Sequence, residues 1–426
     1  MRRIVRSLLP VALVFAMGHP AAADEISDWS WHLVEASLVA PATNPLVMSR
    51  NAALVSAAVF DAINGIERRY TPAFVAPAAV PGASRRAAVV QAAYAILLHL
   101  YPAQAADLET KRAASLAGIT ADAATENSKS IARGLEWGQQ VADAIWAWRL
   151  NDGFSTPLPP FTGGGADGQW RPTPPAMAPG AGVQFATMTP WVIPDASSFR
   201  PAGPPALTSA QYTADYNETK SIGRSDSPLR TADQTLYSQF WQVGTAGGIW
   251  DTLAISLATE RHLVLSEKAR LMAMLNMAMA DAAIGCWDAK YYYVFWRPIT
   301  AIRDADDGNP DTETDAAWSP LFATPAHPDY PSGHSCVSGA AGRVLAAYFG
   351  DDVPLSVENP AMLGVVREFA SFTEALEEVK NARIYSGIHF RTACDDGQGI
   401  GVNVADFVLT HALQPVNGTH AGQVPN

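Results

Sequence analysis

The sequence predicts an all-α protein made of two helical bundles joined by a crossover rich in proline and glycine. Apolar residues recur at helix-like intervals along most of the chain, and no alternating series marks a set of strands. Residues 151–207 instead collect proline and glycine, which interrupt regular structure. With 426 residues, the chain is long enough to bury a core on each side of this segment.

Residues 1–23 have the composition of a secretory signal peptide. Three arginines among the first six residues precede a short apolar run, and Ala21-Ala22-Ala23 offers small residues for cleavage. The run is too short to span a bilayer, which makes a membrane anchor the weaker alternative. We therefore expect an exported, periplasmic or secreted protein that starts at Asp24 and has no membrane span.

The charge and the cysteine content exclude several classes of protein. The net charge is −12, and removal of the signal peptide makes it three charges more negative, because that segment contains three arginines and no acid. Such a surface repels nucleic acid, so an anion-binding pocket must be a local exception. Three cysteines, Cys286, Cys336 and Cys394, cannot form an all-disulfide framework. Buried thiols and a contact between Cys336 and Cys394 are the two alternatives.

The first half of the mature chain, residues 24–150, is expected to be helical. Apolar patterns predict helices over 48–65, 85–100 and 123–150. Asn64-Gly65 gives a C-terminal capping signal for the first of them. Pro102 and Asp152-Gly153 end the other two.

The crossover, residues 151–207, is expected to be ordered. It carries Trp170, Phe185, Trp191 and Phe199, which are too many aromatic residues for a disordered linker. We expect it to drape over the helices and to join both halves into one catalytic unit over 24–426. A flexible tether between independent domains is the alternative.

The C-terminal bundle, residues 208–426, is expected to carry the functional site. The pattern predicts helices over 209–222, 231–243, 252–262, 265–293, 335–349, 361–379 and 397–413.

The first candidate motif pairs Lys290 with Arg297, which precedes Pro298. Seven residues are about two helical turns, so both cations can project from one helix face. The aromatic run 291–296 between them should partly desolvate both charges, and a desolvated cation needs an anionic partner. A solvated helix face is the alternative interpretation.

The second motif is Pro331-Ser332-Gly333-His334, which comes just before a predicted helix. A helix N-terminus presents free N–H groups and the positive end of the dipole. Ser332 adds a hydroxyl donor, Gly333 lets the backbone approach an anion, and His334 can move a proton near neutral pH. An ordinary N-cap with an incidental histidine is the alternative.

The third motif combines Arg383 with His389. The guanidinium group matches the geometry of an oxyanion, whereas His389 has an apolar neighbour on each side, Ile388 and Phe390. Alone, such a histidine is more often a core residue. Together the three motifs supply three cations, a hydroxyl, a glycine and two imidazoles, which suit a tetrahedral oxyanion such as phosphate or vanadate.

In this order and spacing, Lys-x6-Arg-Pro, Pro-Ser-Gly-His and Arg-x5-His resemble the vanadium-dependent haloperoxidases and the related PAP2-type acid phosphatases. The segments 168–172 and 50–65 also resemble the long, exported haloperoxidase branch. The resemblance implies that vanadate oxygens are held by Lys290, Arg297, Ser332, Gly333 and Arg383. It further implies that His389 bonds the vanadium, that His334 is the general acid and base, and that Lys290 polarises the peroxide.

The function implied by this resemblance is oxidation of halide by hydrogen peroxide to a hypohalous species, which then halogenates a small organic acceptor. A phosphatase that forms a phosphohistidine at His389 is one alternative, and a non-enzymatic periplasmic oxyanion-binding protein is another. His327, five residues before Ser332, stands where bromide-oxidising relatives often have an extra histidine. It favours bromide or iodide, and a loop histidine bonded to the backbone is its alternative.

One position departs from the family pattern. Ala393 stands four residues after His389, where the family usually has an aspartate that can orient the imidazole. Asp395 and Asp396 follow at the wrong spacing. The sequence therefore does not identify the group that orients His389.

Overall fold

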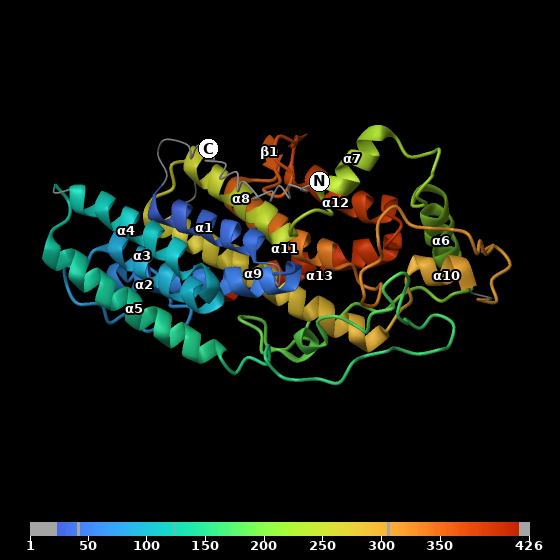
Figure 1. The fold of residues 1–426 in the computed structure, drawn as a ribbon, viewed down its shortest axis with the longest axis horizontal. Coiled ribbons are helices and arrows are strands. Elements are labelled where there is room, and N and C mark those ends of the chain that lie inside the picture. The colour runs from blue at the N-terminus through green and yellow to red at the C-terminus, as the bar shows by residue number, and fades with distance from the viewer. Residues whose placement is uncertain (1–23, 41–42, 123, 305–306, 417–426) are drawn as a thin grey trace, which may run out of the picture.

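The computed structural model describes residues 24–40, 43–122, 124–304 and 307–416 (Figure 1). The predicted signal peptide, residues 1–23, lies outside them. Within the described residues the regular elements are helices, apart from one antiparallel pair of strands, β1 (Leu355–Glu358) and β2 (Val366–Phe369). The prediction of an all-α fold is confirmed.

Five helices form the first bundle. They are α1 (Glu25–Val39), α2 (Pro45–Glu67), α3 (Arg85–Leu100), α4 (Ala105–Ala121) and α5 (Ser128–Arg149), with the 3₁₀ turn η1 (Pro102–Gln104) before α4. The sequence pattern did not predict α4, because only Leu108 and Ile119 of this helix are buried. Helix α2 is long and apolar enough to cross a membrane. It is nevertheless a core helix, since 94% of its most apolar stretch is buried inside the protein.

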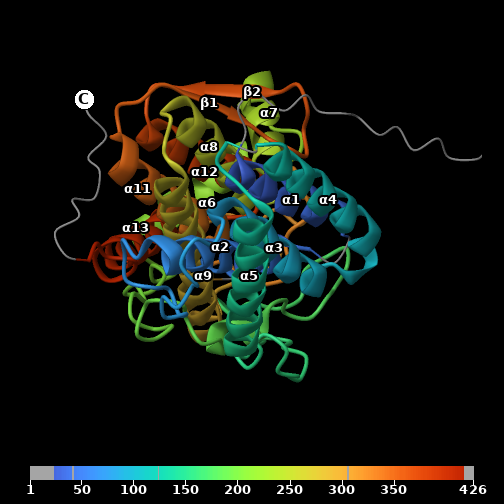
Figure 2. The ribbon, with the colours of Figure 1, turned by 90° about the vertical axis from the view of Figure 1, so that its left-hand side faces the viewer.

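Helix α9 (Leu265–Tyr293) runs through the centre of the molecule and joins the two bundles (Figures 1 and 2). Most of its residues are buried, and it packs against α2 on one side and against α11 (Gly333–Phe349) and α13 (Arg391–His411) on the other. A helix that is buried on all sides lies inside a large core. One hydrophobic core therefore runs through both bundles.

The second bundle is completed by shorter elements around α9, α11 and α13. They are α6 (Ala210–Ile222), α7 (Ala232–Phe240), α8 (Ala246–Glu260), α10 (Pro298–Asp304) and α12 (Phe372–Tyr385). The helix predicted over 361–379 is wrong in its first part, because β2 occupies Val366–Phe369. Helix α12 begins only after Ser371, whose hydroxyl accepts the backbone N–H of Glu374.

The crossover between the bundles contains one short 3₁₀ element, η2 (Val183–Thr187), and is tied to the helices by polar contacts. The buried carboxylate of Asp281 on α9 accepts the backbone N–H groups of Trp191, Val192 and Ile193 at 2.6, 2.8 and 3.0 Å. Further upstream, the N–H of Trp170 donates to the carbonyl of Val294 at 2.7 Å. These contacts fix the crossover on the surface of α9 and at its C-terminal end.

Candidate active site

A cavity of about 350 Å³ lies where the second bundle meets the start of α2 and the crossover. It is lined by residues that the sequence analysis had singled out, together with one aromatic side chain: Trp287, His327, Gly333, His334, Arg383 and His389. Residues 44–46 and 181–182 also line it. The second and third motifs, distant in sequence, therefore meet at this cavity, whereas Lys290, Arg297 and Ser332 lie behind its lining.

Lys290 and Arg297 reach this place from different backbone segments. Helix α9 ends at Tyr293 because Val294 adopts a left-handed conformation with φ of 53° and caps it. Arg297 lies beyond this cap, immediately before α10. The interpretation that both cations project from one helix face is therefore wrong. The reversal of the chain at Val294 returns Arg297 toward the site.

The Lys290 ammonium group holds the segment that leads into α11. The side chain is fully buried, and Nζ donates to the carbonyl oxygens of Pro328 at 2.7 Å, Asp329 at 3.0 Å and Pro331. An ammonium group has three donors, so all of them are directed to this segment. Burial lowers the pKa of Lys290 to about 8.

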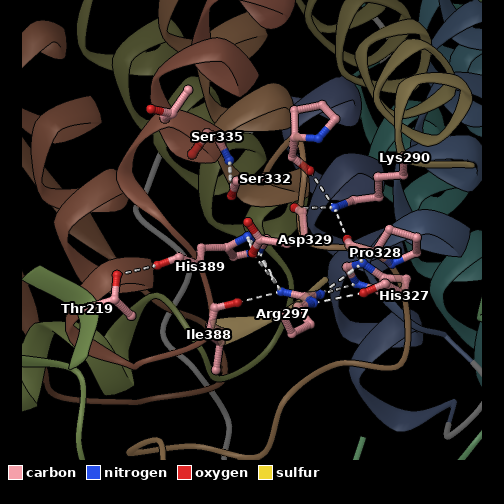
Figure 3. A network of polar contacts seen from close by, with 12 residues as sticks. Thr219, Lys290, Arg297, His327, Pro328, Asp329, Ser332, Ser335, Ile388 and His389 are labelled. Atoms are coloured by element: carbon pink, nitrogen blue, oxygen red, sulfur yellow. Dashed lines mark hydrogen bonds and ion pairs between the residues drawn. The ribbon is translucent and has the colours of Figure 1, made fainter. Parts of the chain in front are cut away.

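The Arg297 guanidinium group lies between the histidine that precedes the second motif and the histidine of the third (Figure 3). Nη1 lies 3.1 Å from Nε2 of His389 and 2.6 Å from the carbonyl oxygen of Ile388. Nη2 lies 3.0 Å from Nδ1 of His327, and Nε donates to the backbone carbonyl of His327 at 2.8 Å. Burial lowers the pKa of Arg297 to about 10.

The second motif forms the start of α11. Ser332 is the N-cap, and its hydroxyl oxygen accepts the N–H of Ser335 at 3.5 Å. Gly333 is required by close packing, because a Cβ atom there would lie 2.8 Å from the Trp287 ring. Burial, assisted by the nearby charge of Arg383, lowers the pKa of His334 well below its usual value. His334 is therefore neutral at pH 7.

Arg383, in the last turn of α12, is almost fully buried and lacks a carboxylate partner among the described residues. Its Nη1 lies 3.5 Å from the carbonyl oxygen of Trp241, whereas its Nε has no hydrogen-bond partner. Burial lowers the pKa of Arg383 to about 9. A desolvated cation with an unused donor is suited to receive an anion from the cavity.

His327 is part of this polar network. Its ring centroid lies 4.9 Å from that of Trp287, and its Nδ1 lies 3.0 Å from Arg297 and 3.2 Å from the carbonyl oxygen of Pro328. The alternative interpretation of His327 was a loop histidine bonded to the backbone. The structure has this backbone contact, to Pro328, and also a contact with the site cation Arg297.

The sequence patterns missed one residue of the site, Asp329. Its carboxylate is fully buried and lies 2.8 Å from Nδ1 of His389 and 3.7 Å from Nη1 of Arg297. Burial raises the pKa of Asp329 to about 7, against the opposing charges of Arg297 and Lys290. The only sequence signal for it was an acid three residues before Ser332.

The two acids that follow Ala393 face other partners. Asp395 pairs with Lys380 at 2.9 Å, and Asp396 accepts the hydroxyl of Tyr330 at 2.5 Å. The carboxylate that contacts His389 therefore comes from the segment before α11 instead of from α13.

The three cysteines are free and buried, and no disulfide joins them. The Sγ of Cys286 lies 3.7 Å from the carbonyl oxygen of Pro331, in the segment that Lys290 holds.

Comparisons with known proteins point to one family. Residues 270–418 match the family model described as the VCPO second helical-bundle domain. The vanadium chloroperoxidase of Curvularia inaequalis is 27% identical over 260 residues, covering 45% of this chain and 42% of that protein. A solved bacterial vanadium-dependent iodoperoxidase superposes with a TM-score of 0.79 at 26% identity, covering 93% of this chain and 97% of that one. The chain is a relative of the vanadium haloperoxidases.

The similarity to individual vanadium haloperoxidases differs in extent. The chain spans 42% of the length of the curated chloroperoxidase. The holo-type structure of a bacterial vanadium-dependent chloroperoxidase shares the fold, with a TM-score of 0.67 at 18% identity and coverage of 91% and 94% of the two chains.

The site residues fit the vanadate group that the names of these vanadium haloperoxidases imply. Three buried cations, Lys290, Arg297 and Arg383, lie around one buried carboxylate, so the site has an excess of positive charge. The unpartnered Nε of Arg383 offers a donor to an oxyanion. Among the described residues, no three His, Cys, Asp or Glu side chains gather as a conventional metal site. The excess of buried cations and the unused donor suit a bound oxyanion such as vanadate.

Proposed function

We propose that this protein is a vanadate-dependent haloperoxidase that uses hydrogen peroxide to oxidise halide to a hypohalous species. The observation that carries the proposal is a cavity lined by Arg383 and His389, with Arg297 in contact with His389 and one Arg383 donor unused. The similarity to vanadium haloperoxidases supports the same conclusion.

The proposed roles divide the site into a cradle and a proton carrier. The cradle residues hold the oxygens of the anion through charge and N–H groups: Lys290, Arg297, Ser332, Gly333 and Arg383. His389 supplies the direct bond to vanadium. When bound, vanadate acts as a Lewis acid that activates peroxide without changing its oxidation state. His334 is neutral at pH 7 because its pKa is lowered, so it can take a proton from incoming peroxide.

Lys290 has a further proposed role, which is to polarise the peroxide oxygen that the halide attacks. Its ammonium group is directed to the backbone carbonyls of the 328–331 segment. A bound oxyanion would therefore share one of these donors with the segment. The lowered pKa of Lys290, about 8, leaves the side chain mostly protonated at pH 7.

The halide is proposed to be bromide or iodide. His327 lies beside Trp287 and Arg297 and lines the cavity, and one solved relative is an iodoperoxidase. Nδ1 of His327 contacts both a donor, Nη2 of Arg297, and an acceptor, the carbonyl oxygen of Pro328. We propose the tautomer with the proton on Nε2, which gives that nitrogen an N–H. Such an N–H can stabilise an incoming halide. His327→Phe is expected to shift the ratio of bromide to chloride turnover, and an unchanged ratio would remove His327 from this role.

The remaining partners are proposed to be hydrogen peroxide and a small organic acceptor that reacts with the released hypohalous species. We further propose export, with cleavage before Asp24. Mass spectrometry of the protein recovered from a secreting host should give a mature N-terminus at Asp24, and an intact Met1 would contradict export through this segment.

A halide panel tests the proposed activity. The purified protein is assayed with peroxide and chloride, bromide or iodide, with and without vanadate. Vanadate-dependent halogenation of a dye, lost in His389→Ala, is the expected result. Hydrolysis of a phosphate ester that vanadate inhibits would instead show an acid phosphatase that uses the same cradle. Oxyanion binding without any turnover would show a scavenger.

A further inference from the structure

The orientation of His389 depends on which of its two ring nitrogens carries the proton. Vanadium requires an unprotonated nitrogen, and the other nitrogen then has a hydrogen to donate. In the vanadium haloperoxidase pattern, a carboxylate four residues further on could accept this hydrogen. Here that position is Ala393, which is buried in an apolar cluster with Tyr212, Phe295 and Phe390. A carboxylate at 393 would be buried among aromatic side chains.

One contact of His389 indicates its protonation pattern. Nη1 of Arg297 lies 3.1 Å from Nε2 and 3.5 Å from Nδ1, so it contacts both ring nitrogens and does not distinguish between them. Nδ1 lies 2.8 Å from Oδ1 of Asp329, and neither oxygen of this buried carboxylate has a hydrogen-bond partner among the described residues. A carboxylate accepts hydrogen bonds, so this unused acceptor beside Nδ1 favours the hydrogen on that nitrogen. Figure 3 shows the imidazole between these two groups.

We propose that Asp329 is the positioning residue of His389, accepting the hydrogen of Nδ1 so that Nε2 is left free to bind the oxyanion metal. In this chain the orienting carboxylate has moved from the first turn of α13 to the segment before α11. The proposal rests on the proposed function, since it assigns Nε2 as the atom that binds vanadate.

Asp329 is itself held in place from both sides. Its backbone N–H donates to the carbonyl of Phe295 at 2.9 Å, and its own carbonyl accepts from Lys290 at 3.0 Å. A group that orients a ligand works only if its own position is fixed. The carbonyl of Ala393 meanwhile accepts the N–H of Ser332 at 2.7 Å, so the position that lost the carboxylate now anchors the second motif.

A competing role for Asp329 is that of a counter-ion to Arg297. The Nη1–Oδ1 distance of 3.7 Å is longer than the 2.8 Å to His389, which favours the imidazole as its main partner. The two roles predict effects of opposite sign on anion binding. Loss of a mere counter-ion makes the site more positive and strengthens the binding of any oxyanion. Loss of a positioning group weakens only the binding that uses the imidazole.

The first experiment reads the protonation pattern directly, without vanadate or turnover. The protein is labelled with ¹⁵N-histidine, and His389→Ala identifies the His389 resonances. The expected spectrum shows a neutral imidazole with the proton on Nδ1, and this proton should move upfield in Asp329→Ala as its hydrogen bond is lost. A parent protein with the proton on Nε2 would overturn the proposal.

The second experiment measures binding of vanadate and of inorganic phosphate by calorimetry. Asp329→Ala is expected to weaken vanadate binding by about 10–100-fold, the range typical for loss of a ligand's outer partner, while phosphate binding stays unchanged or tightens. Asp329→Asn, which keeps an acceptor oxygen, should lie between the parent and the alanine variant. Asp251→Asn, which neutralises another fully buried carboxylate, is the matched control and should leave both affinities unchanged.

A double variant distinguishes action through His389 from a general effect on the fold. In the His389→Ala background, Asp329→Ala should cause no further loss of vanadate binding. A further loss of similar size, or tighter vanadate binding in the single variant, would refute the positioning role. If the protonation pattern and the coupling are found but the loaded protein oxidises no halide, the proposed function fails and the role of Asp329 stands.

Discussion

Replacing Asp251 with asparagine should stabilise the protein at alkaline pH, because this carboxyl group is buried without a well-formed hydrogen bond. Asp251 lies on α8 with only 1% of its surface exposed, and neither oxygen has a hydrogen-bond partner. Its neighbour Asn276 donates instead to Ser56 at 3.0 Å. Burial therefore dominates and raises the pKa of Asp251 to about 7, with a small opposing effect from Asn276.

The size of the effect follows from the difference between the folded and unfolded pKa. A carboxyl group whose pKa is raised by folding favours the folded state below its unfolded pKa of about 4. This contribution is lost as the pH rises toward the folded value of about 7. At about 1.4 kcal/mol per pKa unit, the loss between pH 5 and pH 8 is about 2–3 kcal/mol. Asparagine does not titrate, so the variant avoids this loss.

Urea denaturation at pH 5 and pH 8 measures this effect. The free energy of unfolding of Asp251→Asn, minus that of the parent, should rise by about 2–3 kcal/mol between the two pH values. Other buried carboxyl groups contribute equally to both proteins and cancel in this difference. An equal difference at both pH values, or a variant that is less stable at pH 8, would refute the reasoning.

Three further substitutions test the site and its support. His334→Ala should lower halide turnover by about 100–10,000-fold in a dye assay while vanadate binding, measured by calorimetry, persists, because a proton carrier is lost and the cradle is kept. Gly333→Ala should weaken vanadate binding and lower stability by about 1–3 kcal/mol, because the new Cβ would lie 2.8 Å from the Trp287 ring. Asp281→Ala should destabilise the protein by about 3 kcal/mol in urea, since three backbone N–H groups of the crossover lose their acceptor.

Each of these expectations has an outcome that contradicts it. Full activity in His334→Ala would remove this histidine from proton transfer. Parental affinity in Gly333→Ala would show that the Trp287 ring moves aside without cost. An unchanged urea midpoint in Asp281→Ala would show that water replaces the carboxylate beneath the crossover.

Local signals were sufficient for some helices. Helix α3 has the predicted bounds because its apolar pattern and the stop at Pro102 are both encoded nearby. Helix α9 also has the predicted bounds, although the left-handed residue that ends it was not predicted. Helix α4 was missed since its exposed surface gives little periodicity. The start of α12 was misplaced because the pairing of β1 with β2 is a tertiary contact. The prediction that Lys290 and Arg297 share one helix face was wrong for another reason. The left-handed turn at Val294 uses a β-branched residue, and such residues rarely adopt this conformation.

The candidate site shows the same limit. Spacing within the second and third motifs identified residues that line the cavity, because each motif is a continuous stretch of chain. The partner of His389 was not visible in the same way, since Asp329 lies outside the motifs and meets His389 only in the folded protein. The alanine at 393 signalled that a carboxylate had been lost, and only the structure located its replacement.

The cavity wall is built from both halves of the chain. Arg383 and the three imidazoles come from the second half, whereas residues 44–46 at the start of α2 and residues 181–182 of the crossover come from the first. Changes at residues 44–46 and 181–182 can therefore alter which molecules enter without replacing the groups assigned to the proposed reaction. A family built in this way can diversify its choice of acceptor while its inorganic chemistry stays constant.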